Sequence, residues 1–91
     1  MAECKVHTVL PDALVRLFPE APRRLDLAAS TVDELFEALD SHFPGMAECL
    51  RDNRPSIRKH INVFVRGERA VLSTPLETGE TVYILTAISG G

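Results

Sequence analysis

The sequence predicts one long amphipathic helix, over residues 31–43, and this helix limits the folds open to the chain. Thr31 and Glu34 have the spacing of a capping box, in which the two side chains satisfy early backbone N–H groups. Apolar residues recur every three or four positions, at Val32, Leu35, Phe36, Leu39 and Phe43. Pro44 and Gly45 then end the helix. Because one helix covers only one face of a sheet, we expect a two-layer domain with the other sheet face at least partly open.

Two short strands are predicted before this helix. Residues 4–10 favour β-structure and end at Pro11, which cannot donate a hydrogen bond to a strand ladder. In residues 23–28, leucines alternate with polar residues, so this strand could pair antiparallel with the first. The intervening residues 11–19 carry apolar residues at helical spacing between two prolines. This short segment predicts a partly packed connection rather than a full helix.

The second half of the chain returns to strands. A short helical turn and a loop come first, at residues 46–50 and 52–56. Strands are then predicted at residues 60–66, around residues 70–72 and at residues 81–87, with turns at Gly67-Glu68 and at residues 77–80. One face of these strands belongs in the core, namely Ile61, Val63, Val65, Val82 and Ile84.

The predicted fold is therefore α+β, a mixed sheet of four to five strands packed on one main helix. Alternation places Phe64, Tyr83 and Leu85 on the open face of the sheet. Three apolar side chains from two strands could be neighbours and form a patch that docks a partner. The alternative is that they are scattered surface residues, which are common in soluble proteins.

Length and composition indicate one small folded domain. The chain has 91 residues, of which 45% are hydrophobic and 25% charged, and its net charge is −3, which argues against nucleic acid as a partner. No apolar run reaches the length of a membrane helix, and no secretory signal is recognisable, so we expect a cytoplasmic protein with no membrane partner. Cys4 and Cys49 are too few and too far apart for a disulfide scaffold and are expected to be reduced thiols.

Charges fall into two blocks along the sequence. Residues 26–48 carry only acidic charges, whereas residues 51–69 are mainly basic. Both blocks could be solvated surface, or they could form a docking surface of two signs that orients a protein partner.

The chain offers little for catalysis of its own, so we expect a protein that is not an enzyme. Its three histidines, His7, His42 and His60, do not have metal-ligand spacing, and we expect no metal site. The sequence contains neither a Gly-rich phosphate loop nor a Gly-x-Ser-x-Gly elbow. Neither Cys–His pairs nor the acids on the exposed helix face have the surroundings that tune a catalytic group.

The last six residues differ from the rest of the chain. The final strand runs into Thr86-Ala-Ile-Ser-Gly-Gly91, a tail of small residues. Because glycine has no Cβ, such a tail can pass through a narrow channel and bring the carboxylate of Gly91 close to another active site. An ionised carboxylate is a poor electrophile. ATP in a partner's active site could convert it to an acyl-adenylate, from which sulfur or an amine displaces AMP.

With these features, the whole chain resembles the ubiquitin-like β-grasp sulfur carriers of the MoaD/ThiS type. The resemblance depends on four motifs in this order: Ser30-Thr-Val-Asp-Glu-Leu35, Ile61-Asn-Val-Phe-Val-Arg-Gly-Glu68, Thr74-Pro-Leu-Glu-Thr-Gly-Glu-Thr-Val-Tyr-Ile-Leu85 and Ile88-Ser-Gly-Gly91. Each motif is weak alone, and their order and spacing make the combination specific. It implies a β-grasp domain over residues 1–85 and a flexible tail over residues 86–91.

The resemblance also implies a role for each part of the surface. The partner is an adenylyltransferase resembling ubiquitin-activating enzymes, which activates Gly91 for conversion to a thiocarboxylate. The resemblance assigns the partner's tail channel to Gly90, Ser89 and Ile88, and the docking surface to Phe64, Tyr83 and Leu85. No cofactor need bind this chain, because the activating partner supplies ATP and metal. Many relatives have Pro where this chain has Thr86, which leaves the stiffness of the tail's exit open.

The thiocarboxylate would donate sulfur to a biosynthetic enzyme, and the chain could be the small subunit of such a synthase complex. Its length and the loop over residues 53–60 favour molybdopterin-type or cysteine biosynthesis over the shorter thiamine carriers. Two other functions stay open: a ubiquitin-like modifier joined through Gly91 to lysines, and a β-grasp interaction module with an inert tail.

Overall fold

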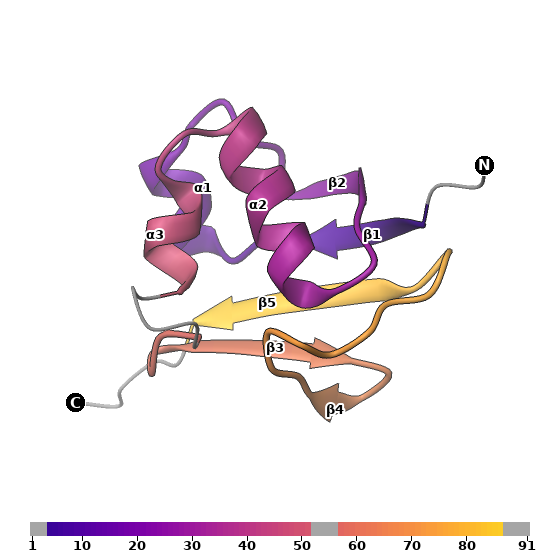
Figure 1. Ribbon diagram of the computed structural model, residues 1–91. Helices are drawn as coiled ribbons and strands as arrows, with labels where there is room; N and C mark the ends of the chain where they lie inside the picture. The colour runs from indigo at the N-terminus through magenta and orange to yellow at the C-terminus, as the bar shows by residue number, and fades with distance from the viewer. Residues whose placement is uncertain (1–3, 52–56, 87–91) are drawn as a thin grey trace.

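One five-stranded sheet with helices packed on one face forms the structure (Figure 1). The computed structural model describes residues 4–51 and 57–86. The strands are β1 (Lys5–Val9), β2 (Arg24–Ala28), β3 (Ile61–Val65), β4 (Glu68–Arg69) and β5 (Thr81–Thr86), and the helices are α1 (Asp12–Leu17), α2 (Val32–His42) and α3 (Met46–Leu50). The predicted α+β fold with one main helix is confirmed.

The strand order β2-β1-β5-β3-β4 makes β5 the central strand. β1 pairs antiparallel with β2, as predicted, and parallel with β5. On its other side β5 pairs antiparallel with β3, and β3 pairs antiparallel with the two residues of β4. Because β1 and β5 are parallel, both finish at the same end of the sheet, where α1 also lies (Figure 1).

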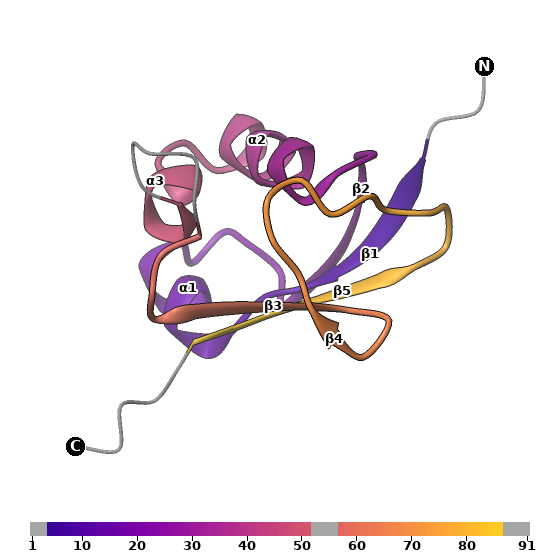
Figure 2. The ribbon, with the colours of Figure 1, turned by 60° about the horizontal axis from the view of Figure 1, so that its bottom comes forward.

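Helix α2 covers the sheet with the apolar stripe predicted for it (Figure 2). Its core-facing residues, Val32, Leu35, Phe36 and Leu39, have no exposed surface. The opposite side chains of the core come mainly from β1, β3 and β5. Burying four large apolar side chains contributes several kcal/mol, which makes α2 the main support of the sheet.

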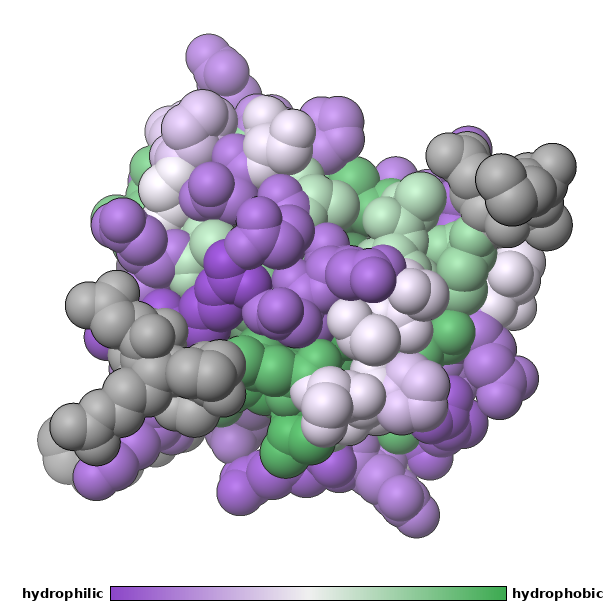
Figure 3. Space-filling view, viewed as in Figure 1, coloured by the Kyte–Doolittle hydropathy of each residue, from purple (hydrophilic) through white to green (hydrophobic). Residues whose placement is uncertain are grey.

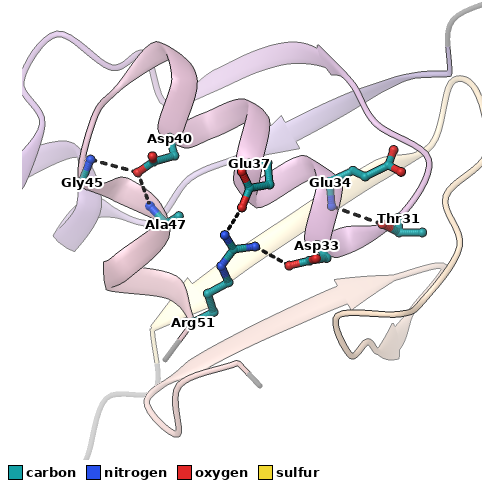
Figure 4. A network of polar contacts seen from close by, with 8 residues as sticks. All are labelled: Thr31, Asp33, Glu34, Glu37, Asp40, Gly45, Ala47 and Arg51. Carbon is teal, nitrogen blue, oxygen red and sulfur yellow. Dashed lines mark hydrogen bonds and ion pairs between the residues drawn. The ribbon is translucent and has the colours of Figure 1, made fainter. Parts of the chain in front are cut away.

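The cap of α2 confirms half of the predicted capping box. Thr31 Oγ1 accepts a hydrogen bond from Glu34 N at 3.2 Å (Figure 4). The Glu34 carboxylate, however, accepts from Ser30 Oγ at 2.6 Å and Ser30 N at 2.9 Å, one residue earlier than a capping box requires. These two bonds lower the pKa of Glu34, the hydroxyl contributing most and the backbone N–H less.

Polar contacts join α2 to α3. Asp40 Oδ1 accepts from Gly45 N at 2.9 Å and from Ala47 N at 3.2 Å, which stabilises the tight connection between the helices (Figure 4). Gly45 has a φ of +97°, a conformation that suits glycine.

Arg51, at the end of α3, donates hydrogen bonds to both Asp33 and Glu37 of α2 (Figure 4). The bond to Glu37 is the main reason that the pKa of Arg51 is raised, while partial burial opposes the shift. Arg51 is the first residue of the basic block, residues 51–69, and it pairs with two acids of the acidic block, residues 26–48. The two blocks of charge therefore contact each other within the molecule at this point.

Two sequence predictions need correction. Residues 11–19 were expected to form a connection, but they contain the short helix α1, which buries Leu14 in the core. Propensity alone does not support so short a helix, whereas burial of its one core residue does.

The strand expected around residues 70–72 is also wrong, because β4 lies at Glu68–Arg69 and its turn consists of Arg66 and Gly67. Both turn residues have positive φ, 55° and 78°, as a two-residue type I′ hairpin requires. The chain then leaves the sheet towards α2, where the carbonyl groups of Leu72 and Thr74 accept from early N–H groups of the helix.

Candidate docking surface

A row of apolar side chains crosses the open face of the sheet. Strand register places Val9 of β1 beside Tyr83 of β5, and Tyr83 beside Phe64 of β3. The ends of this row are basic, because Arg24 pairs with Val9 and Arg69 pairs with Phe64. We call Val9, Tyr83 and Phe64 the apolar row. An apolar strip with a charged rim is typical of surfaces that bind proteins.

The structure places all three sequence-predicted docking residues on this face. Phe64 and Tyr83 are directly paired neighbours, and Leu85 lies two positions beyond Tyr83, opposite Asn62. The exposed fraction is 48% for Tyr83 and 43% for Leu85, and Phe64 is half-buried. They are grouped rather than scattered, which favours the patch over the alternative. Their role in docking stays a prediction.

Val9 was missed by the sequence analysis. It lies next to Tyr83 only because β1 and β5 pair in parallel, and this pairing joins segments more than 70 residues apart in the chain. Alternation within residues 4–10 could have placed Val9 on the open face, but no local signal gives its neighbours.

A polar pair borders the apolar row on β1 and β2. His7 Nδ1 and Asp26 Oδ1 are 2.6 Å apart, and both side chains are more than half exposed, at 57% and 58%. They line a shallow hollow together with Arg24, Thr81 and Tyr83. The hollow adds hydrogen-bonding groups beside the apolar row, as the rim of a protein interface does.

The proposed tail begins directly after β5. Thr86, the last described residue, pairs with Ile61, and Leu85 precedes it on the open face. Ile88, Ser89, Gly90 and Gly91 lie outside the described residues, so their predicted roles stay predictions. The predicted boundary between residues 85 and 86 also stays a prediction, and β5 itself extends through Thr86.

The opposite end of β5 is held by hydrogen bonds. Glu80 Oε1 accepts from Glu77 N at 2.8 Å, and Glu80 Oε2 accepts from Arg66 Nη1. The Glu80 carbonyl accepts from His7 N at 2.8 Å, and Gly79 N donates to the Lys5 carbonyl at 2.8 Å. Burial opposes ionisation of Glu80, but the hydrogen bonds from Glu77 and Arg66 outweigh it and lower the pKa.

Residues 4–51 and 57–86 contain no cluster of three His, Cys, Asp or Glu side chains that could hold a metal ion. Cys4 and Cys49 are free thiols, and Cys4 Sγ donates to the Leu76 carbonyl at 3.2 Å. Among the described helices, none has the length and apolar character needed to cross a membrane.

The helical face differs from the open face of the sheet. In Figure 3, hydrophilic residues gather over α2 and α3, with a smaller apolar area below them, over β3 and the segment after β4. Val71, in the segment after β4, is 60% exposed and lines a hollow with Ile57 and Leu72. Val71 therefore provides an exposed apolar position away from the apolar row.

The strand order, the single main helix and the open sheet face define a ubiquitin-like β-grasp domain. The model of the ThiS family matches residues 15–91, and the chain belongs to this family. The expected MoaD/ThiS-type family is therefore confirmed. No curated protein matches the chain in sequence.

Several solved structures share the fold. A chain of the Amycolatopsis orientalis BexX/CysO complex has a TM-score of 0.82 at 24% identity, covering 94% of this chain and 99% of that chain. Mycobacterium tuberculosis CysO has a TM-score of 0.81 at 21% identity, covering 91% of this chain and 99% of that chain. SAMP1 from Haloferax volcanii has a TM-score of 0.79 at 22% identity, covering 96% of this chain and 99% of that chain.

Proposed function

We propose that this protein is a sulfur carrier whose Gly91 is adenylated by a partner enzyme and converted to a thiocarboxylate. The observation that carries the proposal is the extent of the ThiS family match, which runs through residue 91 and so includes Ser89, Gly90 and Gly91. The likeness to CysO from two organisms is in keeping with it. The chain acts as a protein cosubstrate and not as an enzyme.

The chemistry takes place at one carboxyl group. A carboxylate oxygen of Gly91 attacks the α-phosphorus of ATP, and pyrophosphate leaves, which gives an acyl-adenylate. Hydrosulfide then attacks the acyl carbon, and the bond to the AMP oxygen breaks. The products are a thiocarboxylate, AMP and one proton, with no change in the oxidation state of sulfur. The activating enzyme supplies the ATP site and the metal ion.

Binding of the partner and the chemical step use different parts of the chain. The apolar row and Leu85 bind the activating enzyme, while Ile88, Ser89 and Gly90 occupy its tail channel. Burying Tyr83 and Phe64 supplies binding free energy far from the reacting carbon. The two glycines then let the backbone pass where a Cβ would collide with the channel wall.

A sulfur-accepting biosynthetic enzyme is the second partner. We assign the pathway to molybdopterin-type cofactor or cysteine biosynthesis, with the chain as cosubstrate or as the small subunit of a synthase complex. The complex of CysO with BexX is an example of a structural neighbour bound to a second protein. The same docking surface would serve both partners in turn.

A second candidate function is protein modification. The likeness to small archaeal modifier protein 1 of H. volcanii favours it. In that case an amine, the Nζ of a lysine, displaces AMP from the acyl-adenylate and forms an isopeptide bond with Gly91.

Intact mass distinguishes these functions. The protein is incubated with ATP, sulfide and an adenylyltransferase of the ubiquitin-activating type from the same source, beside a variant that lacks Gly91. We expect a mass gain equal to the replacement of one oxygen by sulfur, absent from the shortened variant. Isopeptide-linked Gly91 on lysines of other proteins, without this mass gain, would favour the modifier. An unchanged mass together with no Gly91-linked conjugate, with an enzyme shown to activate another carrier, would contradict both functions.

A further inference from the structure

A small apolar hollow lies where the proposed tail leaves the domain. We call it the α1 hollow. Its lining comes from both helical and sheet elements: Ala13, Leu14 and Leu17 of α1, Cys49 of α3, Ile61 of β3 and Thr86 of β5. Figure 2 shows α1 beside the end of β5 and the start of β3. The hollow therefore adjoins the C-terminal end of β5, where Leu85 of the open sheet face also lies.

The lining of the α1 hollow is predominantly apolar. Leu14 and Ile61 are 2% and 5% exposed, whereas Leu17 is 65% exposed, the highest value among the large apolar side chains of the described residues. Arg58 and His60 also line the hollow, and the Nε of Arg58 donates to the Glu48 carbonyl at 2.6 Å. The exposed Leu17 and the apolar hollow beside it together form an apolar surface that a partner can bury.

The length of the tail limits where the activating enzyme can sit. Five residues follow Thr86, ending at Gly91, so even a fully extended tail reaches only about 17 Å beyond β5. The enzyme must enclose that tail, and its surface therefore passes close to the residues that surround Thr86. Leu85 lies on one side of this point, and Leu17 lines the same hollow as Thr86.

We infer that the α1 hollow receives an uncharged apolar side chain of the enzyme that activates Gly91, with Leu17 as its exposed wall. This inference rests on the proposed function and adds a second anchor to it, separate from the apolar row. The two anchors hold the enzyme around the root of the tail from α1 and from the open sheet face. Such a clamp fixes the direction in which the tail enters its channel.

Steady-state ATP–pyrophosphate exchange tests the α1 hollow. The substitution Leu17→Gln keeps the length of the side chain and removes its apolar end, and Val71→Thr is the matched control at a 60% exposed apolar residue elsewhere. We expect Leu17→Gln to raise the KM for the carrier about tenfold with little change in kcat, because it removes an apolar contact made on binding. Val71→Thr leaves KM unchanged.

A second variant guards against a folding defect at Leu17. Ala13 is exposed and lines the same hollow, so Ala13→Gln fills the space without removing a core contact. We expect it to raise KM as Leu17→Gln does, with an unchanged thermal midpoint.

The outcomes separate the inference from the function. Unchanged KM for both α1 variants, while removal of Gly91 abolishes exchange, overturns the inference and leaves the carrier function standing. A wild-type dimer that Leu17→Gln converts to a monomer also overturns it, because a second copy then fills the hollow. Failure of every adenylyltransferase of this type from the source organism to activate the wild-type chain overturns the proposed function and this inference together.

Discussion

The two ends of β5 are built in opposite ways. At the start of the strand, the side chain and carbonyl of Glu80 accept hydrogen bonds from Glu77, Arg66 and His7. At its finish, exposed leucines, Leu85 and Leu17, adjoin the root of the tail. One end fixes the central strand within the domain, and the other presents apolar surface for a partner to bury.

The start of β5 therefore contributes to the stability of the domain, and its finish contributes to binding. The hydrogen-bonding groups at the start of β5 are already paired within the domain, so they are not free to bind a partner. Exposed apolar groups, in contrast, contribute favourable free energy only when a partner buries them. Substitutions at the start of β5 should therefore change the free energy of unfolding. Substitutions at its finish and on the apolar row should change binding.

The largest expected effect concerns the apolar row. Phe64→Asp places a charge within the row, next to Tyr83, and should raise the KM for activation by about a hundredfold, with little change in the thermal midpoint. Val71→Asp is the matched control, since it adds the same charge at an exposed apolar position outside the row. A large loss of thermal stability in Phe64→Asp would instead place this side chain in the core.

Glu80→Ala should have the opposite pattern. It removes the acceptor of the bonds from Glu77 N and Arg66, and the free energy of unfolding should fall by about 1–2 kcal/mol in urea denaturation. The KM for activation should not change. Glu77→Ala keeps the backbone N–H that Glu80 accepts and serves as control, with an effect close to zero. An equal loss in both variants would contradict the assignment to the Glu80 carboxylate.

A smaller effect should follow acidification. The pKa of Glu80 is lowered below its ordinary value of 4.5, so its ionised form contributes stability that is complete above that pH and is lost as the pH falls through the lowered pKa. The difference in unfolding free energy between the wild type and Glu80→Gln should therefore shrink as the pH falls from about 7 to about 3. A constant difference over this range would show that the charge of Glu80 contributes nothing.

Local patterns predicted most of the elements. The apolar stripe of α2 and the alternation in β3 and β5 were sufficient to predict these elements. Each element buries one face, and the spacing of its apolar residues indicates which face that is. The same alternation correctly placed Phe64, Tyr83 and Leu85 on the open face.

Features that depend on distant parts of the chain were not predictable. The parallel pairing of β1 with β5 brings Val9 into the apolar row, and no local signal encodes it. Helix α1 is too short for its periodicity to be distinctive, so the α1 hollow was also missed. The contact of Arg51 with two acids of α2 needs the turn between α2 and α3, which only the folded chain provides.

Amide chemical-shift mapping tests the contrast between the two ends of β5 most directly. The ¹⁵N-labelled protein is titrated with the adenylyltransferase that activates it, and the perturbed amides are assigned. We predict perturbations at Leu17, Phe64 and Tyr83–Thr86, with Gly79 and Glu80 unchanged. Perturbations concentrated at Gly79, Glu80 and the Arg66–Gly67 turn, with Leu17 and Leu85 unchanged, would contradict the account.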